Sequence, residues 1–204
     1  MITALKETYE KDTKNRVIES WSSTITRFAY RDSLYLTPFS GLPLTLYYDN
    51  DYPNPRSRNL TTIYTYGETF SSYYAKQTEY LNSYYQDNRD VSAAGANEIS
   101  EFFQSKVKYG YDKLNDFSNK LINYLENGYG MEIVLEGYAS PLAETEYNRI
   151  LTSRRVSAVI NHFYKYNGGA FRQFIKNGQL RIRVEPYGES RSASGVSDDA
   201  KDRF

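Results

Sequence analysis

Apolar residues recur along the chain with two periods, about 3.6 and 2, which predict helices and strands respectively. The longest helical pattern covers 97–127, where Asn97 can cap the first turn and Gly128 can end the helix. Its apolar residues form one stripe, which we expect to lie in the core: Ile99, Phe102, Phe103, Val107, Tyr111, Leu114, Phe117, Leu121 and Leu125.

Three shorter helices are predicted in the same way, over 69–86, 144–166 and 170–177. The pair Gly168 and Gly169 ends the second of them, and Gly178 ends the third, since glycine tolerates the left-handed backbone found after helices.

Alternation with period 2 predicts three core strands, over 42–51, 131–138 and 179–186. A looser alternation over 24–36 predicts an extended segment at the edge of a sheet. The residues expected to face the core are Leu42, Leu44, Leu46 and Tyr48 in the first core strand, Met131, Ile133 and Leu135 in the second, and Leu180, Ile182 and Val184 in the third.

The order strand, helix, strand, helix, strand is typical of an α+β or α/β sandwich, and the long connections permit parallel pairing. We expect one domain over 37–204, preceded by an N-terminal extension or linker over 1–36. The segment 57–95, with its tyrosine-rich helix, is an insertion after the first strand. No strand pattern follows 186, so we expect that the closing C-terminal strand is missing, or that the sheet is completed from elsewhere.

Charge is balanced over the 204 residues, with 25 Lys and Arg against 25 Asp and Glu. It is uneven locally, because the segment 147–184 contains eight Lys and Arg and no acid. Such a segment favours anionic partners. The alternative is that these side chains lie on solvated faces and pair with acids of neighbouring strands.

The chain has no cysteine, which excludes disulfides and thiolate metal sites. No apolar run is long enough for a transmembrane helix, and the N-terminus lacks the features of a signal peptide. Export would therefore require that a signal had been removed, or that the chain belongs to a longer one.

Nothing in the sequence favours an enzyme. The single histidine, His162, falls late in a predicted helix without a cysteine or a serine elbow nearby, so we expect a structural role. The carboxylates show no spacing diagnostic of glycoside hydrolysis, and no glycine-rich loop precedes a helix. We therefore expect no catalytic residue, no metal and no cofactor.

The segment from Gly137 to Val156 carries the most specific pattern: Gly-Tyr, a small polar pair, a loop, and then a helix with Asn-x-x-Leu-Thr-x-Arg-Arg. It resembles the signature of the OmpA-like peptidoglycan-binding domain, in which a Thr-Asp pair follows Gly-aromatic and the helix contains Asn-x-x-Leu-Ser-x-Arg-Arg-Ala. The spacing agrees without a gap. Where the family has the Asp, this chain has Ser140.

The resemblance implies that the second arginine of the pair, Arg155, binds a carboxylate of the diaminopimelate stem peptide, for which a planar guanidinium is suited. The family's Asp receives the ammonium of diaminopimelate. Ser140 supplies no charge, so Asp49, Asp51 or Glu144 must supply it.

Other residues at these positions receive roles through the same resemblance. Tyr48, Asn50 and Asp51 fall where family members contact the stem peptide. For Asn148 we favour orientation of the preceding turn over contact with the ligand. Two residues are expected to support the fold: Tyr147, and Arg154 through an ion pair with Glu136 or Glu132.

The strand and turn over 46–56 resemble the OmpA-like domains of Bacteroidetes envelope proteins, among them the PorE-like component of the type IX secretion system. This implies a non-catalytic periplasmic domain that anchors an outer-membrane or secretion assembly to peptidoglycan. The alternative is a protein-docking module that kept the fold and lost the ligand. Nucleic-acid binding through 147–184 is a weaker reading, because no groove-reading motif is present.

Overall fold

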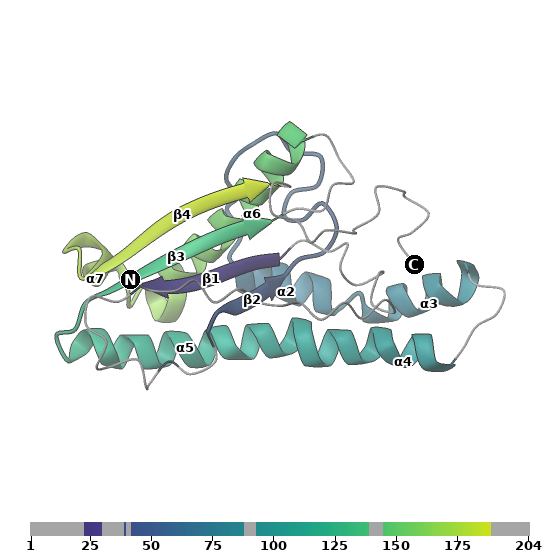
Figure 1. The fold of residues 1–204 in the computed structure, drawn as a ribbon, viewed down its shortest axis with the longest axis horizontal. Helices are drawn as coiled ribbons and strands as arrows, with labels where there is room; N and C mark the ends of the chain where they lie inside the picture. The colour runs from purple at the N-terminus through teal and green to yellow at the C-terminus, as the bar shows by residue number, and fades with distance from the viewer. Residues whose placement is uncertain (1–22, 30–38, 40–41, 88–92, 139–144, 189–204) are drawn as a thin grey trace, which may run out of the picture.

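The structure, a computed structural model, describes residues 23–29, 39, 42–87, 93–138 and 145–188 of the chain, with side chains over most of these ranges (Figure 1). Its elements are β1 (Ser23–Ala29), β2 (Leu44–Tyr47), α2 (Tyr66–Tyr74), α3 (Gln77–Asp87), α4 (Ala93–Phe102), the π-helical segment η2 (Phe103–Lys108), α5 (Tyr109–Glu126), β3 (Met131–Tyr138), α6 (Thr145–Lys165), the short 3₁₀ turn η3 (Tyr166–Gly168), α7 (Arg172–Lys176) and β4 (Leu180–Gly188). The mixed α+β class expected from the sequence is confirmed.

The strands form one mixed sheet in the order β2-β1-β3-β4. β1 runs antiparallel to both of its neighbours, whereas β3 and β4 are parallel and joined by α6. The prediction that the segment containing β1 lies at an edge is therefore wrong. Long-range pairing with β3 places β1 inside the sheet, although it falls in the range expected to be an extension.

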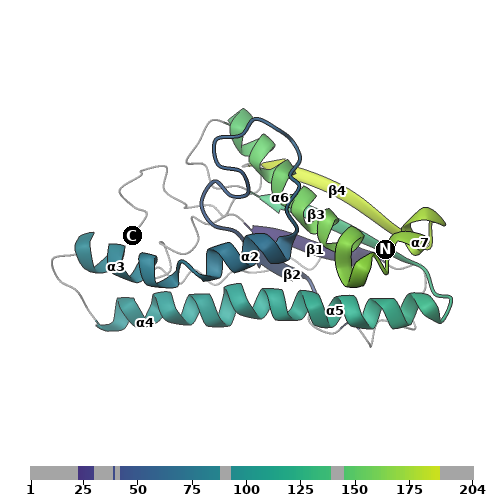
Figure 2. The same cartoon turned by 180° about the vertical axis from the view of Figure 1, so that it is seen from behind.

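Helices cover one face of the sheet (Figures 1 and 2). α6 packs on β3 and β4, and α5 packs on β2. The core between them includes the predicted inward residues of β2 and β3, and Leu180 of β4. Val184, also predicted to face inward, is 39% exposed, so that prediction is wrong for this residue.

The predicted long helix is one continuous column from α4 through η2 to α5, along which α2 and α3 lie (Figure 2). It begins at Ala93, before the predicted cap Asn97. Gly128, with φ 87°, follows its end as predicted. The single helix predicted over 69–86 is two helices, which separate around Ala75 and Lys76.

Aromatic rings join the inserted helices to this column. Phe70 stacks on Tyr111 with ring centroids 4.1 Å apart, and Tyr73 packs against Phe103 at 5.1 Å. The tyrosine-rich helix α2 is therefore part of the core. β3 agrees with its predicted range, and Gly168, Gly169 and Gly178 all have the positive φ expected of residues that end helices.

Candidate functional site

Arg154 and Arg155, adjacent on α6, meet the loop that follows β2. We call residues 49–57 the arginine loop. Three of its non-glycine residues, Asp51, Asn54 and Arg56, have left-handed backbones with φ between 56° and 61°. Asp and Asn tolerate this conformation better than other side chains, and their presence explains why the chain can turn so tightly here.

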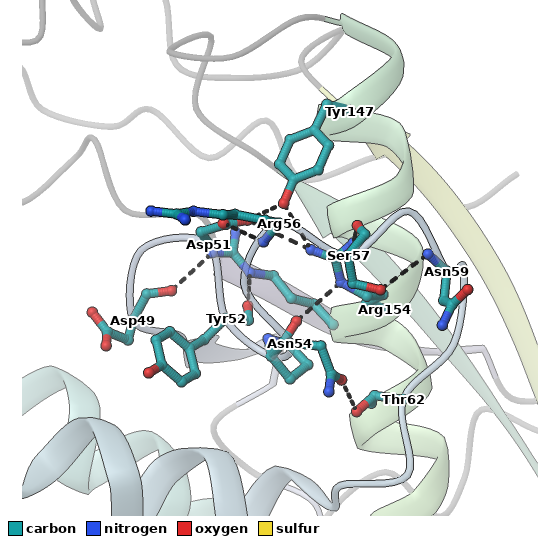
Figure 3. Close-up of polar contacts among 12 residues, drawn as sticks. Asp49, Asp51, Tyr52, Asn54, Arg56, Ser57, Asn59, Thr62, Tyr147 and Arg154 are labelled. Carbon is teal, nitrogen blue, oxygen red and sulfur yellow. Dashed lines mark hydrogen bonds and ion pairs between the residues drawn. The ribbon is translucent and has the colours of Figure 1, made fainter.

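Side chains hold the arginine loop in shape. The main-chain N–H of Arg56 donates to Asp51 Oδ2 (2.7 Å), and that of Asn50 donates to Asp49 Oδ1 (2.8 Å). The hydroxyl of Thr62 donates to Asn54 Oδ1 (2.6 Å), which ties the loop to the segment beyond it (Figure 3). Carbonyl oxygens of the loop are thereby directed at α6.

Arg154 is completely buried, and its guanidinium donates hydrogen bonds both to the arginine loop and to Tyr147 of α6. Its Nε donates to the carbonyl of Pro53 (3.0 Å), its Nη1 to that of Ser57, and its Nη2 to the hydroxyl of Tyr147 (3.2 Å). Asp51 Oδ1 lies 3.5 Å from Nη2 and also accepts the Tyr147 hydroxyl.

The expected bracing role of Arg154 therefore agrees with its geometry, but the partners predicted for it, Glu136 and Glu132, are wrong. Glu132 instead lies 3.7 Å from Arg183 of β4. Glu132 alternates with the core residues Met131 and Ile133 and therefore lies on the face of the sheet away from the helices, whereas the arginine loop contacts Arg154 directly.

Arg155 is equally buried, at 1% exposure, but it is bound differently. Its Nε donates to the carbonyl of Tyr52 (2.9 Å) and its Nη2 to the carbonyl of Asp49 (3.1 Å). Its Nη1 is buried without a hydrogen-bond partner, and among the described side chains no carboxylate lies within ion-pair distance of the guanidinium. Burial lowers the pKa of Arg155 to about 10.

Tyr48 contacts both the guanidinium and the main chain of Arg155. Its ring lies 5.3 Å from the guanidinium carbon, and its hydroxyl donates to the carbonyl of Arg155 (2.7 Å). Tyr48 is 1% exposed, so it contacts this arginine and not solvent. A cation over a tyrosine face is stabilised even where water is excluded.

Asp49 links this arginine to the insertion. Its Oδ2 lies 2.7 Å from Lys76 Nζ and its Oδ1 accepts the hydroxyl of Tyr80 (2.6 Å). The hydrogen bond to Asp49 raises the pKa of Lys76, and burial raises that of Tyr80. Neither contact was predicted from the sequence, because Lys76 and Tyr80 lie about 30 residues after Asp49 in a segment that carried no expected site residue.

The other residues predicted for the site are placed as follows. Asp51 lies at the mouth of the arginine pair with its side chain 28% exposed, Asn50 is exposed, and Asn148 is 2% exposed on α6. Ser140 and Glu144 lie outside the described residues. The structure thus brings together Tyr48, Asp51, Tyr147, Arg154 and Arg155.

His162 is buried away from these residues. Its Nε2 lies 3.0 Å from Ser118 Oγ of α5, and burial lowers its pKa to about 4. Over the ranges that the structure describes, no cluster of three or more His, Asp or Glu could hold a metal ion, and no helix is long and apolar enough to span a membrane.

Comparison with protein-family models, with curated proteins and with solved structures finds no match to this chain.

Proposed function

We propose that the chain is a non-catalytic, OmpA-like periplasmic domain that binds peptidoglycan through the diaminopimelate stem peptide and so anchors an outer-membrane or secretion assembly to the cell wall. The observation that carries the proposal is the unsatisfied Nη1 of Arg155, on a buried cation without a carboxylate partner among the described residues.

A buried charge of this kind is costly to keep, because neither water nor an anion in direct contact stabilises it, and Asp49 and Asp51 act on it only from a distance. A ligand carboxylate would supply both the missing acceptor and the missing charge. Two of the three nitrogens of Arg155 are already fixed by carbonyls of the arginine loop, so the third is oriented before any ligand arrives.

Asp51 is the acid best placed to receive the ammonium of the same ligand. Its side chain is 28% exposed, although Oδ1 lies 3.5 Å from Arg154 Nη2, whereas the side chain of Asp49 is 5% exposed and lies 2.7 Å from Lys76 Nζ. Asp51 would then take the role that the family gives to the Asp at the position of Ser140.

The test is sedimentation of the folded chain with diaminopimelate-type peptidoglycan sacculi. We expect the wild type to sediment and Arg155→Met to remain in solution. Arg149→Met is the matched control, because Arg149 lies on the same helix but is exposed and pairs with Glu146. Circular dichroism shows whether each variant is folded. A folded wild type that stays in solution would refute the proposal.

The alternative is a protein-docking module of an envelope complex that kept the fold without the ligand. It is favoured by one observation: α3 and α4 extend past the sheet as a helical pair (Figures 1 and 2). Their described residues include Glu79, Glu98 and Glu101 and no Lys or Arg. Failure to sediment with sacculi would favour this alternative.

A further inference from the structure

A group of apolar side chains is exposed where the segment before α2 crosses α6. Ile63 is 78% exposed, the largest fraction among the large apolar side chains that the structure describes. Leu60 is 48% exposed, and Tyr64 and Tyr164 are 42% exposed each. We call these four residues the apolar loop patch. Single exposed apolar residues are normal, but a group of them on one surface indicates a binding function.

The backbone beneath the patch is held by α6. Asn161 Nδ2 donates to the carbonyls of Thr62 (2.7 Å) and Tyr64 (2.9 Å), and Lys165 Nζ donates to that of Ile63 (2.8 Å). The N–H of Thr62 donates to Ser157 Oγ (3.2 Å). Four hydrogen bonds therefore hold a segment whose apolar side chain Ile63 is 78% exposed. Its exposure results from a defined conformation.

Two cations lie beside the patch. Lys165 Nζ is bonded to the carbonyl of Ile63, and Arg172 Nε donates to the carbonyl of Tyr164 (2.9 Å). Arg58 precedes the patch in the chain, but its guanidinium lies over the ring of Tyr147, 6.0 Å from the ring centroid. The side chains of Lys165 and Arg172 are both exposed, and within the described ranges neither forms an ion pair.

One acid, Glu68, lies near Lys165, but its carboxylate already accepts the N–H and hydroxyl of Thr65 in the capping box of α2, at 2.6 and 2.8 Å. The surroundings of the patch therefore carry an excess of positive charge.

We propose that the apolar loop patch docks the chain on an anionic lipid surface. Leu60 and Ile63 would enter the acyl boundary, Tyr64 and Tyr164 would lie at headgroup level, and Lys165 and Arg172 would meet lipid phosphates. Apolar side chains flanked by tyrosine and cations suit this boundary, which is apolar on one side and anionic on the other.

A lipid surface suits the patch better than a protein partner does. A stable protein interface takes roughly 20–30 residues from each side. Reversible membrane association needs only a few inserted side chains together with cations near the headgroups. The lipid contact goes beyond cell-wall binding, since it uses none of the residues that hold or surround Arg155.

Co-sedimentation of the full chain with vesicles tests the inference. We expect binding to vesicles of phosphatidylcholine and phosphatidylglycerol in equal parts, and weak binding to phosphatidylcholine alone. Ile63→Asp should lower the partition coefficient at least about tenfold, because it replaces an inserted apolar side chain by a charge that anionic lipid repels. Arg172→Glu should lower it several-fold, and added salt should weaken binding of the wild type.

Tyr85→Asp is the matched control. Tyr85 is 50% exposed on α3, away from the patch, so this change adds the same charge without touching the proposed contact. Failure of the wild type to bind the anionic vesicles, or equal loss in the Ile63→Asp and Tyr85→Asp variants, would overturn the inference. So would concentration-dependent self-association, measured by sedimentation velocity without lipid, that Ile63→Asp abolishes, because the patch would then be a protein interface.

Discussion

Arg155 bonds to Asp49 through the main-chain oxygen of that residue, 3.1 Å from Nη2, while the carboxylate of the same Asp49 pairs with Lys76 at 2.7 Å. The carboxylate of Asp49 is thus paired with Lys76 and not with Arg155. The buried arginine keeps its charge with only dipoles and the ring of Tyr48 in direct contact with it.

This arrangement predicts that the two adjacent arginines differ in their contribution to stability. Arg154→Met should lower the free energy of unfolding by about 3 kcal/mol, because it removes three hydrogen bonds and the cation beside Asp51. Arg155→Met should lower it by only about 1 kcal/mol, since loss of two hydrogen bonds is offset by removal of an uncompensated buried charge.

Urea unfolding of both variants at pH 7 measures the difference, with Arg149→Met as a surface control that should stay within about 0.5 kcal/mol of the wild type. If Arg155→Met proved as destabilising as Arg154→Met, the charge of Arg155 would have to be compensated within the fold.

Gly110 predicts a second effect, on the contact between α5 and β2. A Cβ at this position would lie 2.6 Å from the carbonyl oxygen of Thr45. In an ordinary helix, Gly→Ala stabilises by about 1 kcal/mol. Here we expect Gly110→Ala to destabilise by about 1–2 kcal/mol, because the backbone of β2 must move. Asn123→Ala, an exposed change on the same helix, should be close to neutral in the same urea titration.

His162 predicts a pH dependence of stability. Burial lowers its pKa to about 4, whereas in the unfolded chain it titrates near its ordinary value of about 6.5. Between these two pKa values, His162 is protonated in the unfolded state and neutral in the folded state. Stability is therefore complete above about pH 6.5 and is lost as the pH falls toward 4. Between pH 7 and pH 5 this loss should amount to about 2 kcal/mol.

His162→Gln should remove that part of the slope, because glutamine does not titrate and can still bond to Ser118. The comparison is between urea unfolding of the wild type and the variant at the two pH values, so that carboxylates common to both cancel. An unchanged slope in the variant would mean that His162 is protonated within the fold.

Local signals predicted much of this fold. β3 was correct in its bounds because it alternates strictly, and Gly168, Gly169 and Gly178 were correct as helix ends because glycine tolerates a positive φ. The central position of β1 was missed, since sheet order depends on pairing with a strand more than one hundred residues away.

The sequence predicted which side chains form the candidate site, but it did not predict which groups they contact. The resemblance at Gly137–Val156 drew attention to Arg154 and Arg155, and the structure places both against the arginine loop. Their partners there are mostly carbonyl oxygens, which every residue possesses, so residue types could not reveal them. The available signal was the run Asp51-Tyr52-Pro53-Asn54-Pro55, whose Asp, Asn and two prolines are typical of a loop with left-handed positions.

Asp51 carries the last prediction, which concerns the ammonium of the proposed ligand. Asp51→Asn keeps an oxygen for the N–H of Arg56 and tolerates the left-handed backbone at φ 60°, so the variant should fold. It removes the negative charge, and we expect about tenfold weaker binding of a soluble diaminopimelate stem peptide in calorimetry. A peptide with its free ammonium acetylated separates the charge from the shape of the loop. This peptide should bind wild type and variant equally, because it offers no cation. If Asp51→Asn weakened both peptides alike, Asp51 would act by holding the arginine loop in place, and the partner of the ammonium would have to be sought elsewhere.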